Sequence, residues 1–400
     1  MHSFHVDYKA RTTELCALGA KYDSAKSPLR QRGNASRPCH PFTVFYHGFF
    51  KQHRDKPLSI AEVGLRDGAD LLMWREYFPN ASLQGFDKDP AMLARFRAAH
   101  ENKGMFVSSI AWADDAAAIQ AFVGVGKTYD MIIVNASNDV GDHVRLVKGA
   151  QAWLRPGGML VVEDILKKQS EQAYLSKLAP VMDQFQGAFF VTMDHVHRNP
   201  GRVDDDKVLV LIKAGAPCVF DNGRRLTVVT PVSGDSAALA ASAASVRFEH
   251  VDQWIVVGAP SVMDAKDQRI RVLTCEATNK SAMRNCALEH AIADASFVYF
   301  LEEGATIHPV MYTLLSFADE AFYTFNQSGA SAAAVGNRID GLYMDASMML
   351  TDAARCKSVR WNTSLDEHAA AKQYVKDCYA GNEGDWIFVN NFLSTVAALK

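Results

Sequence analysis

The stretch Glu62-Val63-Gly64-Leu65-Arg66-Asp67-Gly68 decides how the first part of this chain folds. It follows the apolar run 58–61, which predicts a buried strand, and its glycines allow a tight turn into a helix. A second strand-like segment ends in Gly85-Phe86-Asp87. An acid at the end of the second strand of a doubly wound sheet can accept hydrogen bonds from two ribose hydroxyls. We therefore expect a bound cofactor that contains adenosine.

The spacing of the loop distinguishes between adenosine cofactors. A dinucleotide site has the pattern G-x-G-x-x-G, which turns backbone amides toward a pyrophosphate. Here the pattern is E-x-G-x-x-x-G, and Glu62 replaces the first glycine. A carboxylate would repel a pyrophosphate but attract the cationic methionine part of S-adenosylmethionine. We expect Glu62, Gly64, Gly68 and Asp87 to bind that cofactor. The alternative is a purely structural strand–turn–helix connection.

Composition limits the other classes of function. The chain has 400 residues, 48% of them hydrophobic, which predicts two domains with large cores. Its net charge of −3 gives no general attraction to nucleic acid or to an anionic membrane. The seven cysteines form no C-x-x-C pair and are expected to be reduced. Without a visible signal sequence or an apolar run of ~18 residues, a cytoplasmic location with no transmembrane segment is expected.

Strand-like and helical patterns alternate along the chain, which predicts an α/β fold with parallel sheets. In the first part, strands are expected at 58–64, 82–87, 129–134, 158–163 and 207–213, and helices at 90–100 and 142–153. Leu154-Arg155-Pro156-Gly157-Gly158 predicts a turn before the fourth of these strands. The turn-rich segment 214–224 predicts a linker between domains 1–214 and 225–400. In the second part, strands are expected at 226–231, 254–257, 270–273 and 297–301, and a helix at 237–245.

Several motifs in the first domain resemble those of a known family. They are Lys21-Tyr22-Asp23, His40, Tyr46, the loop 62–68, Trp74-Arg75-Glu76-Tyr77-Phe78-Pro79-Asn80, Gly85-Phe86-Asp87-Lys88-Asp89-Pro90 and the segment 156–164. Over about residues 17–212 the chain resembles the class I sugar O-methyltransferases, more narrowly the macrolide-sugar methyltransferase and cephalosporin-hydroxylase-like group. The resemblance implies a Rossmann-like domain that methylates a hydroxyl, often on a sugar. Several family members use a divalent metal held by acidic residues.

The chain departs from this family at its metal position. Where the family has Asp-Asp-Gly-Ser-His after the fourth strand, this chain has Val134-Asn135-Ala136-Ser137-Asn138. A site for Mg²⁺ or Mn²⁺ built from Asn135 and the acids Glu163 and Asp164 would be weaker than in the relatives, because hard cations prefer several anionic oxygens. Asn135 is also expected beside the cofactor. Ser109 is expected near the adenine ring by the position of its loop.

Methyl transfer to a hydroxyl needs a base for the hydroxyl proton. His143 is the first candidate, because it lies just beyond a strand end and its imidazole suits proton removal near neutral pH. The alternatives for the base are Asp139 and Asp142. A histidine at the start of a helix is also commonly a surface or capping residue.

Motifs in the second domain, over about 225–395, resemble the nucleotide-sugar glycosyltransferases of the GT-A type. They are Thr230-Pro231-Val232, the helix around Arg284-Asn285, the strand 297–301 with Glu302-Glu303-Gly304, His308-Pro309, Met344-Asp345-Ala346-Ser347, Trp361 and Asp366-Glu367. The resemblance implies that Thr230 and Arg284 contact a nucleotide sugar. It also implies that Asp366 and Glu367 supply a base. Glu302 and Glu303 would replace the metal-binding D-x-D, although its last position is here Gly304.

These observations predict an S-adenosylmethionine-dependent O-methyltransferase fused to a GT-A-like domain that uses a nucleotide sugar. Its expected acceptor is a sugar or glycoconjugate, and no nucleic-acid partner is expected. One alternative makes the glycosyltransferase the main activity and the first domain a degenerate remnant. Another is a non-enzymatic interaction protein, which would bind neither cofactor.

Overall fold

The chain is described by a computed structural model that covers residues 2–8, 11–30, 39–100, 103–112, 127–196, 204–233, 236–258, 267–277, 279–291, 296–328, 346–382 and 386–395. It forms two compact units, Met1–Asp221 and Asn222–Lys400. The boundary between the units lies inside the segment 214–224. Met344 and Asp345 of the second resemblance lie outside the described residues. Among the described helices, none has the length and apolar character needed to cross a bilayer.

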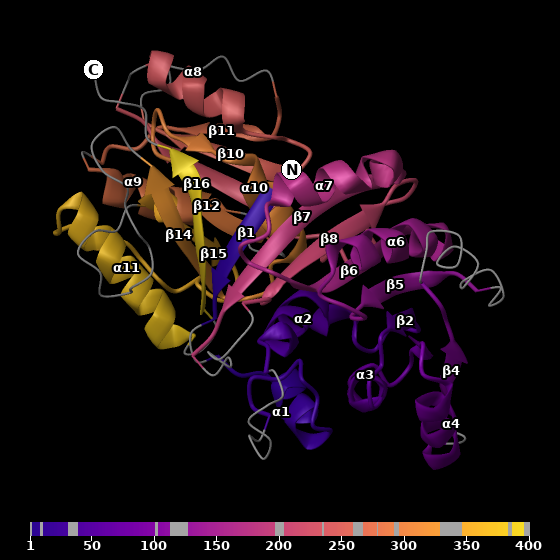
Figure 1. Ribbon diagram of the computed structural model, residues 1–400. Helices are drawn as coiled ribbons and strands as arrows, with labels where there is room; N and C mark the ends of the chain where they lie inside the picture. Colours follow the sequence, from indigo (N-terminus) through magenta and orange to yellow (C-terminus); the bar gives the residue numbers. More distant parts are fainter. Residues whose placement is uncertain are drawn as a thin grey trace. The chain divides into compact units, whose positions relative to one another are not determined.

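The N-terminal unit combines a sheet with helices on both faces (Figure 1). Its strands are β1 (His2–Asp7), β2 (Ser59–Val63), β3 (Ser82–Asp87), β4 (Met105–Ser109), β5 (Tyr129–Val134), β6 (Leu154–Ile165), β7 (Phe185–Asp194) and β8 (Lys207–Lys213). Its helices are α1 (Glu14–Lys21), α2 (Phe42–Phe50), α3 (Ala69–Tyr77), α4 (Pro90–Ala99), α6 (Val140–Ala150) and α7 (Glu171–Leu178), with short 3₁₀ turns η1 (Lys51–His53), η2 (Gln151–Trp153) and η3 (Ala179–Gln184).

The strand order of this sheet is β4-β3-β2-β5-β6-β8-β7-β1. Strands β2 to β6 run parallel, and β8 is antiparallel to both of its neighbours, β6 and β7. This is a Rossmann-like order, and it reverses between β2 and β5. In such sheets ligands bind outside the carboxyl ends of the strands at the point of reversal. The predicted Rossmann-like α/β fold is confirmed.

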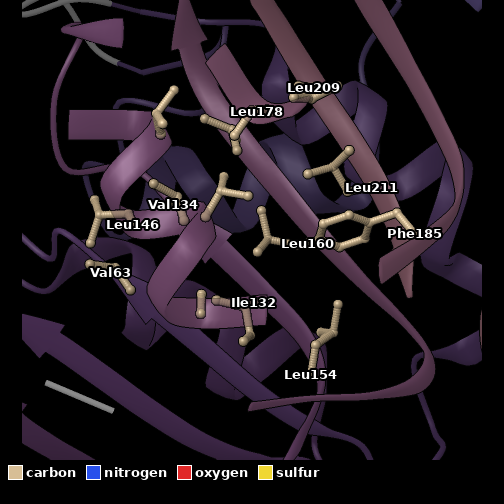
Figure 2. Packing of buried hydrophobic residues seen from close by; sticks show 14 of the residues in the cluster. Val63, Ile132, Val134, Leu146, Leu154, Leu160, Leu178, Phe185, Leu209 and Leu211 are labelled. Atoms are coloured by element: carbon tan, nitrogen blue, oxygen red, sulfur yellow. The ribbon is translucent and has the colours of Figure 1, made fainter. Parts of the chain in front are cut away.

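The core of this unit explains why the apolar runs form its strands. Helices α6 and α7 lie on one face of the sheet, and α2 and α3 lie on the opposite face (Figure 1). Figure 2 shows Leu146 of α6 and Leu178 of α7 among strand side chains such as Ile132 and Leu160, all of them fully buried. Strands covered on both faces are nearly continuous apolar runs. All six residues of β5 are therefore buried.

The turn predicted over 154–158 was wrong, because these residues belong to a strand. The structure starts β6 at Leu154, so the Pro-Gly-Gly segment lies within the strand and not in a turn before it. The pairing with β5 jumps from Tyr129↔Leu154 to Met131↔Met159, which inserts extra residues into β6. Gly157 adopts φ 76, and a Cβ there would lie 2.1 Å from the carbonyl oxygen of Pro217. Gly157 thus allows β6 to form a bulge at the register shift without breaking its pairing with β5.

The C-terminal unit is a second α/β unit. Its strands are β9 (Arg225–Pro231), β10 (Val251–Val257), β11 (Ile270–Leu273), β12 (Ser296–Phe300), β13 (Thr306–Ile307), β14 (Phe322–Ser328), β15 (Met349–Asp352) and β16 (Trp386–Thr395). Its helices are α8 (Ser236–Ser245), α9 (Lys280–Leu288), α10 (Pro309–Phe317) and α11 (Glu367–Gly381), with the 3₁₀ turn η5 (Ala346–Met348). The sheet order is β11-β10-β9-β12-β15-β14-β16, and its first four strands run parallel. The strands predicted for this part are confirmed.

Candidate functional site

The glycine loop follows β2 at the point where the strand order reverses. Gly64 and Gly68 have φ values of 92° and 86°, in the left-handed region that favours glycine. A Cβ on Gly64 would lie 2.1 Å from the carbonyl oxygen of Asn135, and one on Gly68 would lie 2.3 Å from the Phe96 ring. The protein's own packing therefore requires both glycines.

Asp87 ends β3 beside this loop. Its Oδ2 accepts hydrogen bonds from the backbone N–H groups of Leu65, at 2.7 Å, and Arg66, at 3.1 Å. Its Oδ1 accepts from Asp89 N at 3.0 Å. Asp87 thus fixes the shape of the loop. Ser109 pairs with Asp87 in the register of β3 and β4 and has an exposed side chain.

A hollow lies against the glycine loop. Its volume is about 330 Å³, and it is lined by Leu65, Arg66, Asp67, Ala69 and Asp70 on one side and by Asp23, Ala25 and Arg30 on the other. Cavities that hold small molecules begin at roughly this size. The hollow adjoins the loop whose amides Asp87 binds, so the residues present fit an adenosine-type cofactor at this edge of the sheet.

A buried lysine lies behind the loop. Lys26 is 1% exposed, and its Nζ lies 3.1 Å from Glu62 Oε1 and 3.5 Å from Asp70 Oδ2. It also donates a hydrogen bond to Glu163, which accepts another from Tyr46 Oη. Burial alone would lower the pKa of Lys26, but the three carboxylates outweigh it and raise that pKa. Lys26 is therefore a permanent internal cation.

The acids around Lys26 outnumber it. Burial, with the nearby charges of Asp70 and Glu163, raises the pKa of Glu62 to about 8 in spite of Lys26. Burial likewise raises the pKa of Glu163. The group therefore retains a proton at neutral pH, because one lysine cannot compensate three buried carboxylates. Glu62 also accepts a hydrogen bond from Trp74 Nε1 at 3.0 Å.

A second buried group surrounds His40. Its Nδ1 lies 2.9 Å from Asp206 Oδ1 and 3.6 Å from Asp205 Oδ1, and its Nε2 lies 3.9 Å from Asp164 Oδ1. In the described part of the chain, His40, Asp205 and Asp206 form the group of potential metal ligands whose atoms all lie within 4.8 Å of one another. Asp164 itself has φ 57, an uncommon conformation for a residue with a side chain.

Asn135 connects the two groups. With its amide oriented so that Oδ1 faces Lys26 Nζ, at 2.9 Å, its Nδ2 donates to Asp164 Oδ2 at 3.0 Å. An aspartate here would repel Asp164, whereas the amide both donates and accepts. The amide at this position thus suits a place between the Asp164 carboxylate and the Lys26 ammonium.

The predicted metal site does not fit a metal in this arrangement. Both carboxylate oxygens of Glu163 already accept hydrogen bonds, one from Lys26 and one from Tyr46. Asp164 belongs to the His40 group, and Asn135 faces Lys26. A cation that contacted Asn135 and Glu163 would approach the Lys26 ammonium, which repels it.

The predicted bases differ in accessibility. His143 is fully buried, its Nε2 donates to the carbonyl oxygen of Ser137, and burial lowers its pKa. This burial counts against His143 as the base, because no substrate hydroxyl reaches it in this conformation. Asp139 is exposed as the N-cap of α6 and accepts from Asp142 N at 3.0 Å. Asp142 also forms an ion pair with Arg145.

The predicted nucleotide-sugar residues of the C-terminal unit are engaged within the protein. Thr230 is buried inside β9 and accepts a hydrogen bond from Trp254 Nε1 at 2.9 Å. Arg284 is fully buried, and its guanidinium lies 4.4 Å from the centre of the Trp361 ring. These contacts stabilise the unit's own core.

The predicted acidic residues of this unit have partners of their own. Glu302 accepts from Lys280 at 2.7 Å and from Arg284. Glu303 accepts from the backbone N–H of Ser233 at 2.8 Å. Asp366 is the exposed N-cap of α11, and Glu367 lies 2.9 Å from Arg284. Burial would raise the pKa of Glu367, but Lys280 and Arg284 outweigh it and lower that pKa, which makes a weaker base.

Comparison with known proteins relates part of this chain to methyltransferases. No family model matches it. The 8-demethyl-8-(2-methoxy-alpha-L-rhamnosyl)-tetracenomycin-C 3'-O-methyltransferase of Streptomyces olivaceus is 26% identical over 163 residues, 39% of this chain and 38% of that protein. Mycinamicin VI 2''-O-methyltransferase of Micromonospora griseorubida is 24% identical over 167 residues, 39% of this chain and 37% of that protein. About two fifths of the chain is thus similar in sequence to O-methyltransferases. It spans less than half the length of these curated relatives.

Solved structures give only partial superpositions. The MycE methyltransferase of the mycinamycin biosynthetic pathway, in complex with Mg and SAH, aligns with a TM-score of 0.37 and 17% identity over 52% of this chain and 58% of that chain. Human methyltransferase-like protein 13 in complex with SAH aligns with a TM-score of 0.33 and 18% identity over 45% of this chain and 83% of that chain. The predicted methyltransferase resemblance is confirmed by the sequence relatives. None of the relatives and structures named here is called a glycosyltransferase.

Sequence reasoning missed Lys26, Asp70, Asp205 and Asp206. The first of these had a signal, because Lys26 lies three residues after the motif Lys21-Tyr22-Asp23 that carries part of the resemblance. Asp205 and Asp206 had none, since three adjacent acids at 204–206 are usually a solvated turn. Only the pairing of β8 with β6 brings them beside Asp164.

Proposed function

We propose that the N-terminal unit binds S-adenosylmethionine and transfers its methyl group to a hydroxyl of a sugar or glycoconjugate. The observation that carries this proposal is the glycine loop at the reversal of the strand order, tied to Asp87 and open to a hollow of about 330 Å³. The named O-methyltransferase relatives support the same activity.

The residues around the hollow suit a cationic ligand. The cofactor would supply an electrophilic methyl group on a sulfonium. Asp87 lies where a ribose binds in Rossmann-like sheets, and exposed Ser109 beside it would border the base. The three carboxylates around Lys26 outnumber it even with one proton bound, so this edge has a negative potential, which attracts a sulfonium. The ammonium group of Lys26 lies among these acids and reduces the electrostatic repulsion between them.

The acceptor hydroxyl must lose its proton at the same edge of the sheet. Of the three predicted bases, Asp139 has an exposed side chain at the start of α6, just beyond the end of β5. An exposed carboxylate there can accept the proton and release it to water. Replacement of Asp139 by Asn is expected to lower kcat and leave cofactor affinity unchanged.

Calorimetric titration of the full chain with S-adenosylmethionine tests this function. We expect binding at micromolar concentrations, weakened roughly tenfold to a hundredfold by Asp87→Ala, because charged hydrogen bonds contribute about 1.5–3 kcal/mol. Asp366→Ala is the matched control, an aspartate N-cap in the other unit that should leave the affinity unchanged. No binding by the wild-type chain would overturn the proposal.

The strand order of the C-terminal unit supports a second candidate function, nucleotide-sugar binding. The order β11-β10-β9-β12 places a reversal between β9 and β12. The residues after these strands meet there, since Ser233 donates hydrogen bonds to Glu303. Titration with uridine and guanosine diphosphate sugars, with and without Mn²⁺, tests this candidate. Absence of binding to all of them would leave the methyltransferase as the one proposed activity.

A further inference from the structure

We propose that His40, Asp205 and Asp206, with Asp164 beside them, form a divalent-cation site. The family resemblance predicted a metal at Asn135, Glu163 and Asp164; the proposed site borders Asp164 but uses neither Asn135 nor Glu163. The proposal goes beyond methyl transfer and does not depend on it, because it concerns binding of the metal alone.

The geometry of the group is that of a ligand set. One imidazole nitrogen and one oxygen from each of two carboxylates lie within 4.8 Å of one another, as they must if they are to surround a single ion. The side chains of His40, Asp205 and Asp206 are 6%, 8% and 7% exposed, so water competes little for the site. Asp164, whose side chain is 4% exposed, lies near the other ring nitrogen of His40. Its Oδ1 is 3.9 Å from Nε2.

Three different segments of the chain build the group. His40 lies just before α2, and its backbone N–H donates to the carbonyl oxygen of Ala25 at 2.8 Å. Asp164 lies near the end of β6. Asp205 and Asp206 precede β8, which pairs with β6 through Ile165↔Lys207. Antiparallel pairing therefore holds the acids of both strands at one edge. A group fixed by sheet pairing is preorganised to bind a cation.

The charge of the group is the second argument. Three buried carboxylates, those of Asp164, Asp205 and Asp206, lie around one imidazole and attract a cation. Arg66 lies 3.5 Å from Asp164, but its side chain is 49% exposed and therefore well screened. Lys26 cannot contribute, because it already contacts Glu62, Asp70 and Glu163. Buried carboxylates are normally paired or bound to a metal, and a divalent cation here would add to the pairing that the imidazole gives.

The ligand types indicate which cation. Imidazole with carboxylates suits Mn²⁺ or Zn²⁺, whereas Mg²⁺ and Ca²⁺ prefer oxygen ligands alone. Asn138 donates to Asp205 Oδ2 at 2.7 Å, which leaves Oδ1 of that carboxylate toward His40. Such a bond from a neighbouring amide orients a metal-binding carboxylate.

Metal titration of the full chain without S-adenosylmethionine tests the proposal. Binding of MnCl₂ is followed by the loss of the free Mn²⁺ EPR signal, and binding of ZnCl₂ by calorimetry. We expect one site per chain, weakened at least about tenfold by His40→Gln and by Asp206→Asn. Glu163→Gln is the matched control, since it removes the acid of the other position and should leave metal affinity within about threefold.

The outcomes separate clearly. Loss of binding in Glu163→Gln alone would place the ion at the resemblance-predicted position and overturn the proposal, as would no binding of either metal by the wild-type chain. Circular dichroism shows whether each variant folds. If a variant does not fold, the anomalous signal of Mn²⁺ in wild-type crystals decides, with a peak between His40 and Asp206 expected and a peak at Glu163 contradicting it. A negative result in the metal titration would not affect the proposed methyltransferase function, which the S-adenosylmethionine titration tests separately.

Discussion

Lys26 is the residue on which the N-terminal unit most depends. We expect Lys26→Met to lower the free energy of unfolding by about 3–5 kcal/mol, because it leaves three buried carboxylates without their cation. Urea denaturation measures the change. Lys21→Met is the control, since Lys21 is 55% exposed in its ion pair with Glu76 and its loss should change the free energy of unfolding far less. Equal effects of the two changes would contradict the central role of Lys26.

Glu62 gives the stability an unusual pH dependence. Its pKa is raised from 4.5 to about 8, mainly by burial, so between these values the folded chain binds a proton that the unfolded chain releases. The contribution of this proton is fully present below pH 4.5 and is lost as the pH rises through 8. We expect Glu62→Gln to remove this loss and flatten the curve of denaturation midpoint against pH between about 5 and 9. A variant curve parallel to that of the wild type would contradict the shift.

At the scale of elements, the strands predicted from apolar runs are present because burial on both faces requires such runs. Strands β1, β4, β7 and β13 to β16 were not predicted, and β4 and β7 illustrate why. Phe106 of β4 is 54% exposed, and β7 begins with the mixed sequence Phe-Gln-Gly-Ala. The glycine loop and Asp87 were predictable because a local turn fixes them. The groups around Lys26 and His40 were not, because their members come together only through strand pairing and helix packing.

Gly64 lies in the turn between β2 and α3, and its replacement tests whether this turn requires glycine. We expect Gly64→Ala to destabilise the chain by about 1–3 kcal/mol, since its φ is 92° and a Cβ would lie 2.1 Å from Asn135 O. The matched control is Gly48→Ala in α2, where nothing lies within 4 Å of the added Cβ and alanine favours the helix by about 0.5–1 kcal/mol. Thermal melting should therefore move in opposite directions. A melting temperature of Gly64→Ala equal to that of the wild type would show that the loop relaxes.

At the scale of the whole molecule, each unit has a core of its own. The C-terminal unit packs Trp361 against Tyr374, with ring centres 4.7 Å apart, inside a cluster separate from the N-terminal core. Glu302, one of the two acids predicted in place of a D-x-D metal site, is paired with Lys280 and Arg284. The sequence could not show that protein cations neutralise Glu302, because helix α9, which carries both cations, meets this acid only in the folded unit.

The two units should therefore respond separately to mutation. We expect Arg284→Ala to destabilise the C-terminal unit by about 3–5 kcal/mol, because it leaves Glu302 and Glu367 without the buried guanidinium that pairs with them. Hydrogen exchange should speed up in α9 and α11 while β2 and β3 keep their protection, since local stability follows local packing. Titration of the same variant should give an S-adenosylmethionine affinity within about threefold of the wild-type value. Loss of that affinity would mean that cofactor binding draws on both units, and the methyltransferase site could then not be assigned to the N-terminal unit alone.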